Sequence, residues 1–207
     1  GAVADYFYEM DLFSKIQPLV VSIFGDAVPT EFIRHIWSIV FADENFSKNQ
    51  EQFILNSNAF DDSSFDPELK LKEYLEQHDQ IMNAAPLTLI YNLVKPNRDR
   101  FISFLTYIQK ICDNDLKSAL EVNNSNFPSI LLSSIEDYHE MIEKDEVFDM
   151  ILALFTSLAG HALKSRDALT FFHNFSTLKG NFRPFFTLDL LRTLLFLFQS
   201  PDDSPYA

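Results

Sequence analysis

The chain has 207 residues, of which 47% are hydrophobic and 22% are charged, and this balance excludes a wholly disordered protein. Glycine is scarce, with 4 residues where the average usage of about 7% would give about 14. Sheets need glycine in tight hairpins and bulges, so the scarcity disfavours them. The net charge of −14 disfavours nucleic acid and anionic lipid as partners, because an acidic surface repels phosphate.

Hydrophobic residues at helical spacing predict helices throughout the first half of the chain. Their starts are marked by proline, which fits the first turn of a helix, and by capping side chains that accept a free backbone N–H. We expect helices over residues 5–16, 19–24, 30–40, 47–54, 67–82 and 86–94. Residues 56–66 form the longest expected loop, which is polar except for Phe60 and Phe65.

The second half of the chain continues the same pattern. We expect helices over residues 98–112, 128–144, 147–163, 165–180 and 185–198, with a short amphipathic piece at 116–120 and an asparagine-rich turn at 123–126. The prediction is therefore an all-α protein with about eleven helices, as one domain over residues 1–200 followed by a polar tail at 201–207. We expect this domain to be part of a longer chain.

Successive pairs of these helices occupy about 35 to 45 residues, which is the period of HEAT and armadillo repeats. At the level of architecture the sequence resembles an ARM/HEAT-like α-solenoid, and an irregular multi-helix bundle is the alternative. The pairs share no visible sequence identity, and no signature of a named family is present. The resemblance implies a stack of helix pairs with an extended binding surface.

The sequence contains no pattern typical of an enzyme site. Glycine occurs only at positions 1, 25, 160 and 180, which excludes the glycine-rich loops that bind phosphate. Glu136 and His139 have the i, i+3 spacing of di-iron proteins, but such sites need a second copy and two further glutamates. Cys112 follows an apolar helical stretch, which favours a buried thiol over a reactive one. We therefore expect no enzymatic activity, no cofactor and no metal.

Two groups of residues are candidates for binding a partner. The first is the acidic run at 136–149, where a basic protein segment could dock on Glu136, Glu140, Glu143 and Glu146. The second consists of aromatic anchors, namely Phe60 and Phe65 of the expected loop or Trp37, for which packing in the core is the other interpretation. A set of basic residues near the C-terminus is the counterpart of the acidic run, and it comprises Lys164, Arg166, Lys179, Arg183 and Arg192.

The last expected helix, residues 185–198, has ten large apolar side chains and almost no polar face. A helix that is apolar all round must be covered on both sides, and this one is too short to span a bilayer. Either it is the core of a bundle, or its outer side binds another surface. In the second case we expect exposed side chains among Phe186, Leu190, Leu197 and Phe198, available to a partner or to a second copy of the chain.

These observations lead to two hypotheses about function. The first is a non-enzymatic scaffold or adaptor module that binds a protein or peptide segment along a helical groove. The alternative is a regulatory helical domain of a larger enzyme or of a GTPase-controlled protein. Ser63, which has Asp61, Asp62 and Asp66 around it, is a candidate phosphorylation site for an acidophilic kinase. Because no basic stretch followed by an apolar core lies near residue 1, we expect a cytoplasmic protein, with the nucleus left open.

Overall fold

The computed structural model describes residues 12–24, 28–43, 46, 66–138, 143–177 and 184–197. Within these residues every regular element is a helix, ten α-helices and one 3₁₀ helix, which confirms the predicted all-α class. The chain divides into two compact units, Gly1–Pro96 and Asn97–Ala207. The single domain over residues 1–200 and the ARM/HEAT resemblance stay predictions. Phe60, Phe65 and Ser63 lie outside the described residues, as does the expected helix at 47–54.

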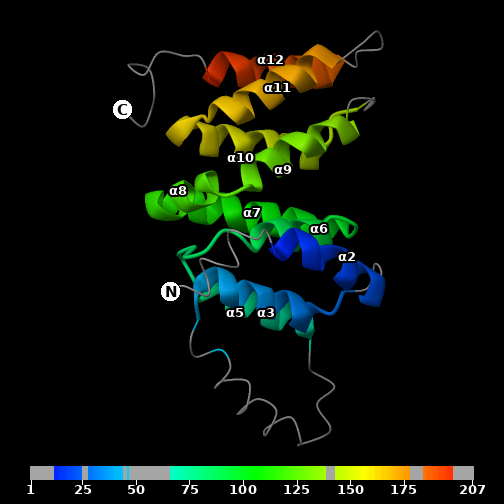
Figure 1. Ribbon diagram of the computed structural model, residues 1–207, viewed down its shortest axis with the longest axis vertical. Coiled ribbons are helices and arrows are strands. Elements are labelled where there is room, and N and C mark those ends of the chain that lie inside the picture. Colours follow the sequence, from blue (N-terminus) through cyan, green and yellow to red (C-terminus); the bar gives the residue numbers. More distant parts are fainter. Residues whose placement is uncertain are drawn as a thin grey trace, which may run out of the picture. The chain divides into compact units, whose positions relative to one another are not determined.

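Unit 1, Gly1–Pro96, contains four described helices, which are α2 (Leu12–Phe24), α3 (Thr30–Phe41), α5 (Pro67–Glu76) and α6 (Leu87–Val94). Helix α2 packs on α6, and α3 packs on both α5 and α6 (Figure 1). The core side chains from α3 and α6 include Ile33, Ile36, Val40, Leu87, Ile90 and Tyr91. Trp37 is also in this core, 2% exposed, so the interpretation of Trp37 as a surface anchor is wrong and core packing is confirmed.

Helix α2 continues through Pro18, whereas the sequence predicts a break between residues 16 and 19. A proline inside a helix removes one backbone hydrogen bond and costs about 3 kcal/mol. Tertiary contacts on both sides of Pro18 offset this cost. Asn92 Nδ2 donates a hydrogen bond to Gln17 Oε1 at 2.9 Å, and Val20 is buried.

Helix α5 begins as predicted but ends at Glu76, six residues before the predicted end at Met82. At its start the Asp66 side chain accepts a hydrogen bond from Glu68 N at 3.0 Å. After its end, Met82 N and Asn83 N both donate to Val40 O, at 3.0 and 2.9 Å. The last carbonyl groups of a helix have no partner within the helix. The segment after α5 is not helical because its backbone N–H groups donate to the Val40 carbonyl, which has no partner within α3.

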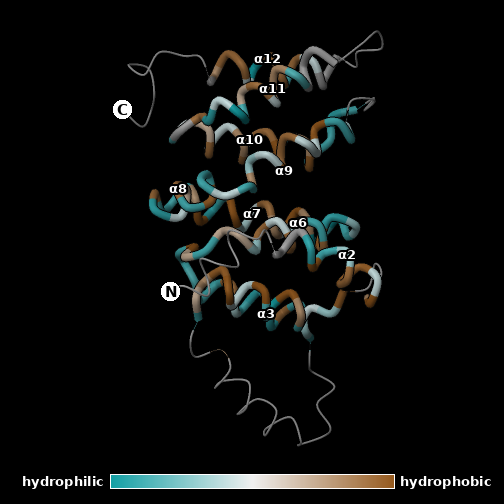
Figure 2. The backbone as a smooth tube through the Cα atoms, viewed as in Figure 1, coloured by the Kyte–Doolittle hydropathy of each residue, from teal (hydrophilic) through white to brown (hydrophobic). Residues whose placement is uncertain are grey.

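Unit 2, Asn97–Ala207, is organised around one helix. Its described elements are α7 (Arg98–Asn114), α8 (Leu116–Asn124), α9 (Phe127–Ser134), a 3₁₀ helix η1 (Ile135–Tyr138), α10 (Glu146–Ala162), α11 (Ser165–Thr177) and α12 (Pro184–Leu197). Helix α10 packs on α7, α8, α9 and α12, while α11 packs on α9 (Figure 1). Hydrophobic residues run along α10 and α12 in particular (Figure 2). The core of unit 2 therefore surrounds α10.

The helix predicted at 128–144 is shorter than expected. Helix α9 ends at Ser134 and passes into the 3₁₀ turn η1, in which Ile135 is buried. Residues 143–145 are not helical, because Asp145 is the N-cap of α10. Its carboxylate accepts hydrogen bonds from Val147 N at 2.8 Å and Phe148 N at 3.4 Å. Asn97 likewise caps α7, because its Oδ1 accepts a hydrogen bond from Arg100 N at 3.1 Å.

We predict that Asp145→Ala lowers the free energy of unfolding by about 1 kcal/mol, the usual loss when a capping side chain is removed. Asp145→Asn is the matched variant, because it keeps a capping oxygen and removes only the exposed ion pair with Arg98, whose atoms are 3.3 Å apart. Exposed pairs of this kind contribute about 0–1 kcal/mol. Urea denaturation of both variants measures the difference. Equal losses would show that the ion pair, and not the cap, stabilises α10.

Candidate functional site

Some residues of the acidic run at 136–149 form hydrogen bonds and ion pairs within unit 2. Glu136, Glu143 and Glu146 are exposed, while Glu140 lies outside the described residues. Asp145 caps α10 and pairs with Arg98, and Asp149 lies 2.9 Å from Lys144 Nζ. The run is thus less negative than its composition indicates. A binding role for its four glutamates stays a prediction.

Helix α12 packs on α10 and leaves part of its apolar surface exposed. Leu190, one of the four side chains among which exposed positions were expected, is only 1% exposed and belongs to the packed side, so the expectation is wrong for Leu190. The helix is apolar all round, and its sequence therefore does not indicate which side packs. Its large apolar side chains that are exposed are Leu188, Leu191, Leu195 and Phe196. The side chains of Phe186 and Leu197, and all of Phe198, lie outside the described residues.

An open groove of about 500 Å³ runs along α10 between α7 and α12. Its lining residues are Gln109 and Asp113 from α7, Asp149, Leu152, Ala153, Thr156, Ser157 and Gly160 from α10, and Asp189, Arg192, Thr193 and Phe196 from α12. Small side chains form most of the floor. No atom lies within 4 Å of the position that a Cβ would take on Gly160, so the space above this glycine is free.

The three helices around the groove run in the same direction. At one end Arg98 pairs with Asp145, and farther along Ser157 Oγ donates to Asp113 Oδ1 at 3.2 Å, so α7 is parallel to α10. Helix α12 follows the direction of α10 in Figure 1. From Asp149 to Gly160 the floor extends for about 16 Å, at 1.5 Å for each helical residue. One end of the groove therefore lies at Asp149, and the other end lies at Asp113 and Gly160.

The hydroxyl groups in the groove already donate to other groups. Thr156 Oγ1 donates to Leu152 O at 2.6 Å, and Thr193 Oγ1 donates to Asp189 O at 3.0 Å. Ser157 donates to Asp113, as described above. With three aspartates and one arginine the lining has a net charge of −2. The polar groups of the groove are thus mainly hydrogen-bond acceptors with a net negative charge, and they suit a ligand that carries donors.

Two of the three carboxylates in the groove have a cationic neighbour. Lys144 Nζ lies 2.9 Å from Asp149, and Arg192 Nη1 donates to Asp189 Oδ1 at 3.1 Å. The hydrogen bond to Asp149, and then the charges of Asp149 and Asp189, raise the pKa of Lys144. Asp113 is different, because no cationic group of the described residues lies within ion-pair distance of it.

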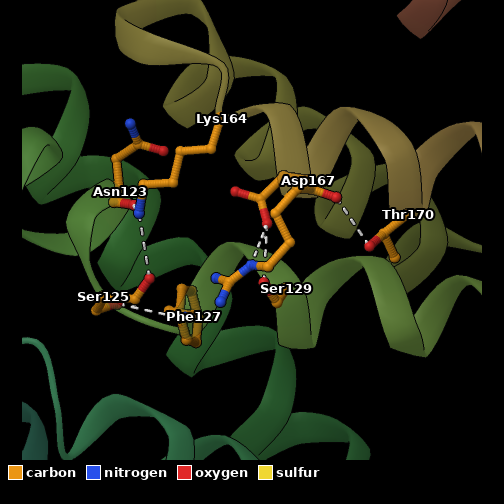
Figure 3. A network of polar contacts seen from close by, with 8 residues as sticks. Asn123, Ser125, Phe127, Ser129, Lys164, Asp167 and Thr170 are labelled. Carbon is orange, nitrogen blue, oxygen red and sulfur yellow. Dashed lines mark hydrogen bonds and ion pairs between the residues drawn. The ribbon is translucent and has the colours of Figure 1, made fainter. Parts of the chain in front are cut away.

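A second polar cluster in unit 2 connects α8, α9 and α11 (Figure 3). Lys164 Nζ donates to Asn123 O and, at 3.5 Å, to Ser125 O, which are carbonyls at the end of α8. Asp167 is 2% exposed and accepts a hydrogen bond from Ser129 Oγ at 2.8 Å. Burial lowers the pKa of Lys164. Because these groups bind one another and are largely buried, we interpret the cluster as structural.

Unit 1 contains an Asp–His–Tyr cluster that the sequence analysis did not identify. Tyr74 OH donates to Asp43 Oδ2 at 3.1 Å, and His78 Nε2 lies 3.8 Å from the same oxygen. The His78 ring stacks on Phe41, with ring centres 4.3 Å apart. The only sequence signal was Tyr74 and His78 at i, i+4 on one helical stretch. These contacts join α5 and the segment after it to the end of α3, and we interpret them as packing.

Cys112 is buried, as predicted. Burial, and then the negative charges of Asp113 and Asp115, raise the pKa of its thiol to about 12. Among the described residues no group of three or more histidine, cysteine, aspartate or glutamate side chains is arranged to hold a metal ion. No helix in the described part of the chain is long and apolar enough to cross a membrane.

Comparison of the chain with protein-family models, with curated proteins and with solved structures found no match. The groove along α10 is therefore interpreted from its own residues.

The raised pKa of Cys112 predicts a loss of stability at alkaline pH. A thiol that ionises near 9.0 when unfolded and near 12 when folded stabilises the folded state fully below pH 9. This contribution is lost at about 1.4 kcal/mol for each pH unit between these two values. Urea denaturation from pH 7 to 10 should show a steeper decline for the wild type than for Cys112→Ala. Parallel curves would contradict the buried thiol.

Proposed function

We propose that this chain is a non-enzymatic interaction module that binds a segment of a partner protein in the groove along α10. The observation that carries the proposal is the groove itself, an open space of about 500 Å³ over a floor of small side chains. The free space above Gly160 supports it, because a bound backbone can approach the floor closely there.

The size of the groove fits a short stretch of polypeptide. A floor of about 16 Å accommodates about eleven residues of a helix or about five residues of an extended chain. Helix-in-groove recognition uses such a surface between neighbouring helices. The acceptors and the net charge of −2 favour a segment with donor or basic side chains, in agreement with the basic partner expected from the sequence.

The floor of the groove lies on a well-packed helix of unit 2. The other side of α10 is packed with buried side chains, which include Phe148, Ile151, Phe155 and Leu158. Sites built on well-packed helices hold their geometry better than sites on loops. The groove is therefore available in the free protein, and binding does not need to form it first.

We predict that filling the groove at Gly160 abolishes binding without harming the fold. Gly160→Leu places a large side chain in free space, and the loss of a helical glycine raises the free energy of unfolding by about 0.5–1 kcal/mol. The probe is a displayed library of random 12-residue peptides, selected on the wild-type chain. Enriched peptides should bind Gly160→Leu at least about tenfold more weakly, a loss of about 1.4 kcal/mol.

Gly160→Ala is the matched control, because it gives the same gain in helix stability with a side chain too small to fill the groove. It should bind the selected peptides as the wild type does. The proposal is wrong if the library yields no enriched peptide, or if enriched peptides bind Gly160→Leu and the wild type equally.

A further inference from the structure

We propose that Asp113 binds a lysine or arginine side chain of the segment that occupies the groove. This inference rests on the proposed function and names the chemistry by which the groove selects its partner. Asp113 is at the end of α7, exposed, and next to the free space above Gly160 in the lining of the groove.

The other aspartates of unit 2 near this region cap a helix or pair with a cation, whereas Asp113 does neither among the described residues. Asp115 and Asp145 are the N-caps of α8 and α10. Asp149 and Asp189 pair with Lys144 and Arg192. The charge of Asp113 is not matched by any cation of the described residues, and a ligand can supply that cation.

Asp113 occupies a position in its helix where a negative charge is disfavoured. It lies in the last turn of α7, which ends at Asn114. The helix dipole places partial negative charge at this end, so a carboxylate is disfavoured there. The charges of Asp113 and Asp115 both oppose ionisation of buried Cys112. The helix dipole therefore disfavours the charge of Asp113, and a bound cation would offset this effect.

Two neighbouring side chains hold the Asp113 carboxylate in one orientation. Gln109 Nε2 donates to Oδ1 at 2.8 Å, and Ser157 Oγ donates to the same oxygen at 3.2 Å. Oδ2 accepts no hydrogen bond from the described residues. A carboxylate fixed through one oxygen, with the other free in an open groove, is arranged to accept a charge-assisted hydrogen bond from an ammonium or guanidinium group.

The experiment uses the same random peptide library, selected in parallel on the wild type and on Asp113→Asn. The asparagine keeps an oxygen that can accept from Gln109 and Ser157, so we expect an unchanged circular dichroism spectrum. Peptides from the wild type should be enriched in lysine or arginine at one position, and peptides from Asp113→Asn should not. Replacing that residue by glutamine should weaken binding to the wild type about tenfold and leave binding to Asp113→Asn unchanged.

Asp99→Asn is the matched control, because Asp99 is an exposed acid of the same helix, α7, that does not line the groove. It should select the same peptides as the wild type, with affinities within about twofold. Peptides that Gly160→Leu excludes, but that show no basic preference and bind Asp113→Asn as well as the wild type, would overturn this inference and leave the proposed function standing. A library without enriched peptides would overturn both.

Discussion

The burial of α10 is the interaction on which unit 2 depends. Six of its large side chains are buried against the surrounding helices, namely Val147, Phe148, Ile151, Leu154, Phe155 and Leu158. Each contributes about 1.5–3 kcal/mol compared with an exposed position. The opposite side of the same helix has mostly small side chains between α7 and α12. Helix α10 therefore forms both the centre of the core and the floor of the groove. The packing that stabilises the core of unit 2 also fixes the geometry of the groove.

The features that were predicted correctly from the sequence are determined by local interactions. Helix starts at Pro67, Arg98 and Glu146 follow from capping side chains and proline, which act on backbone groups within three residues. Errors occurred where a distant group decided the outcome. The end of α5 depends on a carbonyl of α3, and α2 continues through Pro18 because α6 holds it. No local pattern contains these contacts.

The groove could not be predicted from the sequence for a similar reason. The small residues Ala153, Ser157 and Gly160 have helical spacing, and this signal could have been noticed. These residues form the floor of a groove only because α7 and α12 lie on either side of them, and tertiary packing determines that arrangement. The run of glutamates was predicted to bind a partner because a high density of charge can be recognised in a sequence. Asp113 is a single acid, and it is distinguished only by the absence of a described cationic neighbour.

The paired hydrogen bonds on Val40 O have a consequence for the local opening of unit 1. Met82 N and Asn83 N share this one acceptor, at the last turn of α3. Their amide protons can exchange with solvent only when the segment before α6 separates from α3. Exchange rates at these two amides should therefore be similar and should follow the same dependence on denaturant, as expected for one cooperative opening unit. Two neighbouring amides in an irregular segment thus report on how firmly the last turn of a helix is held.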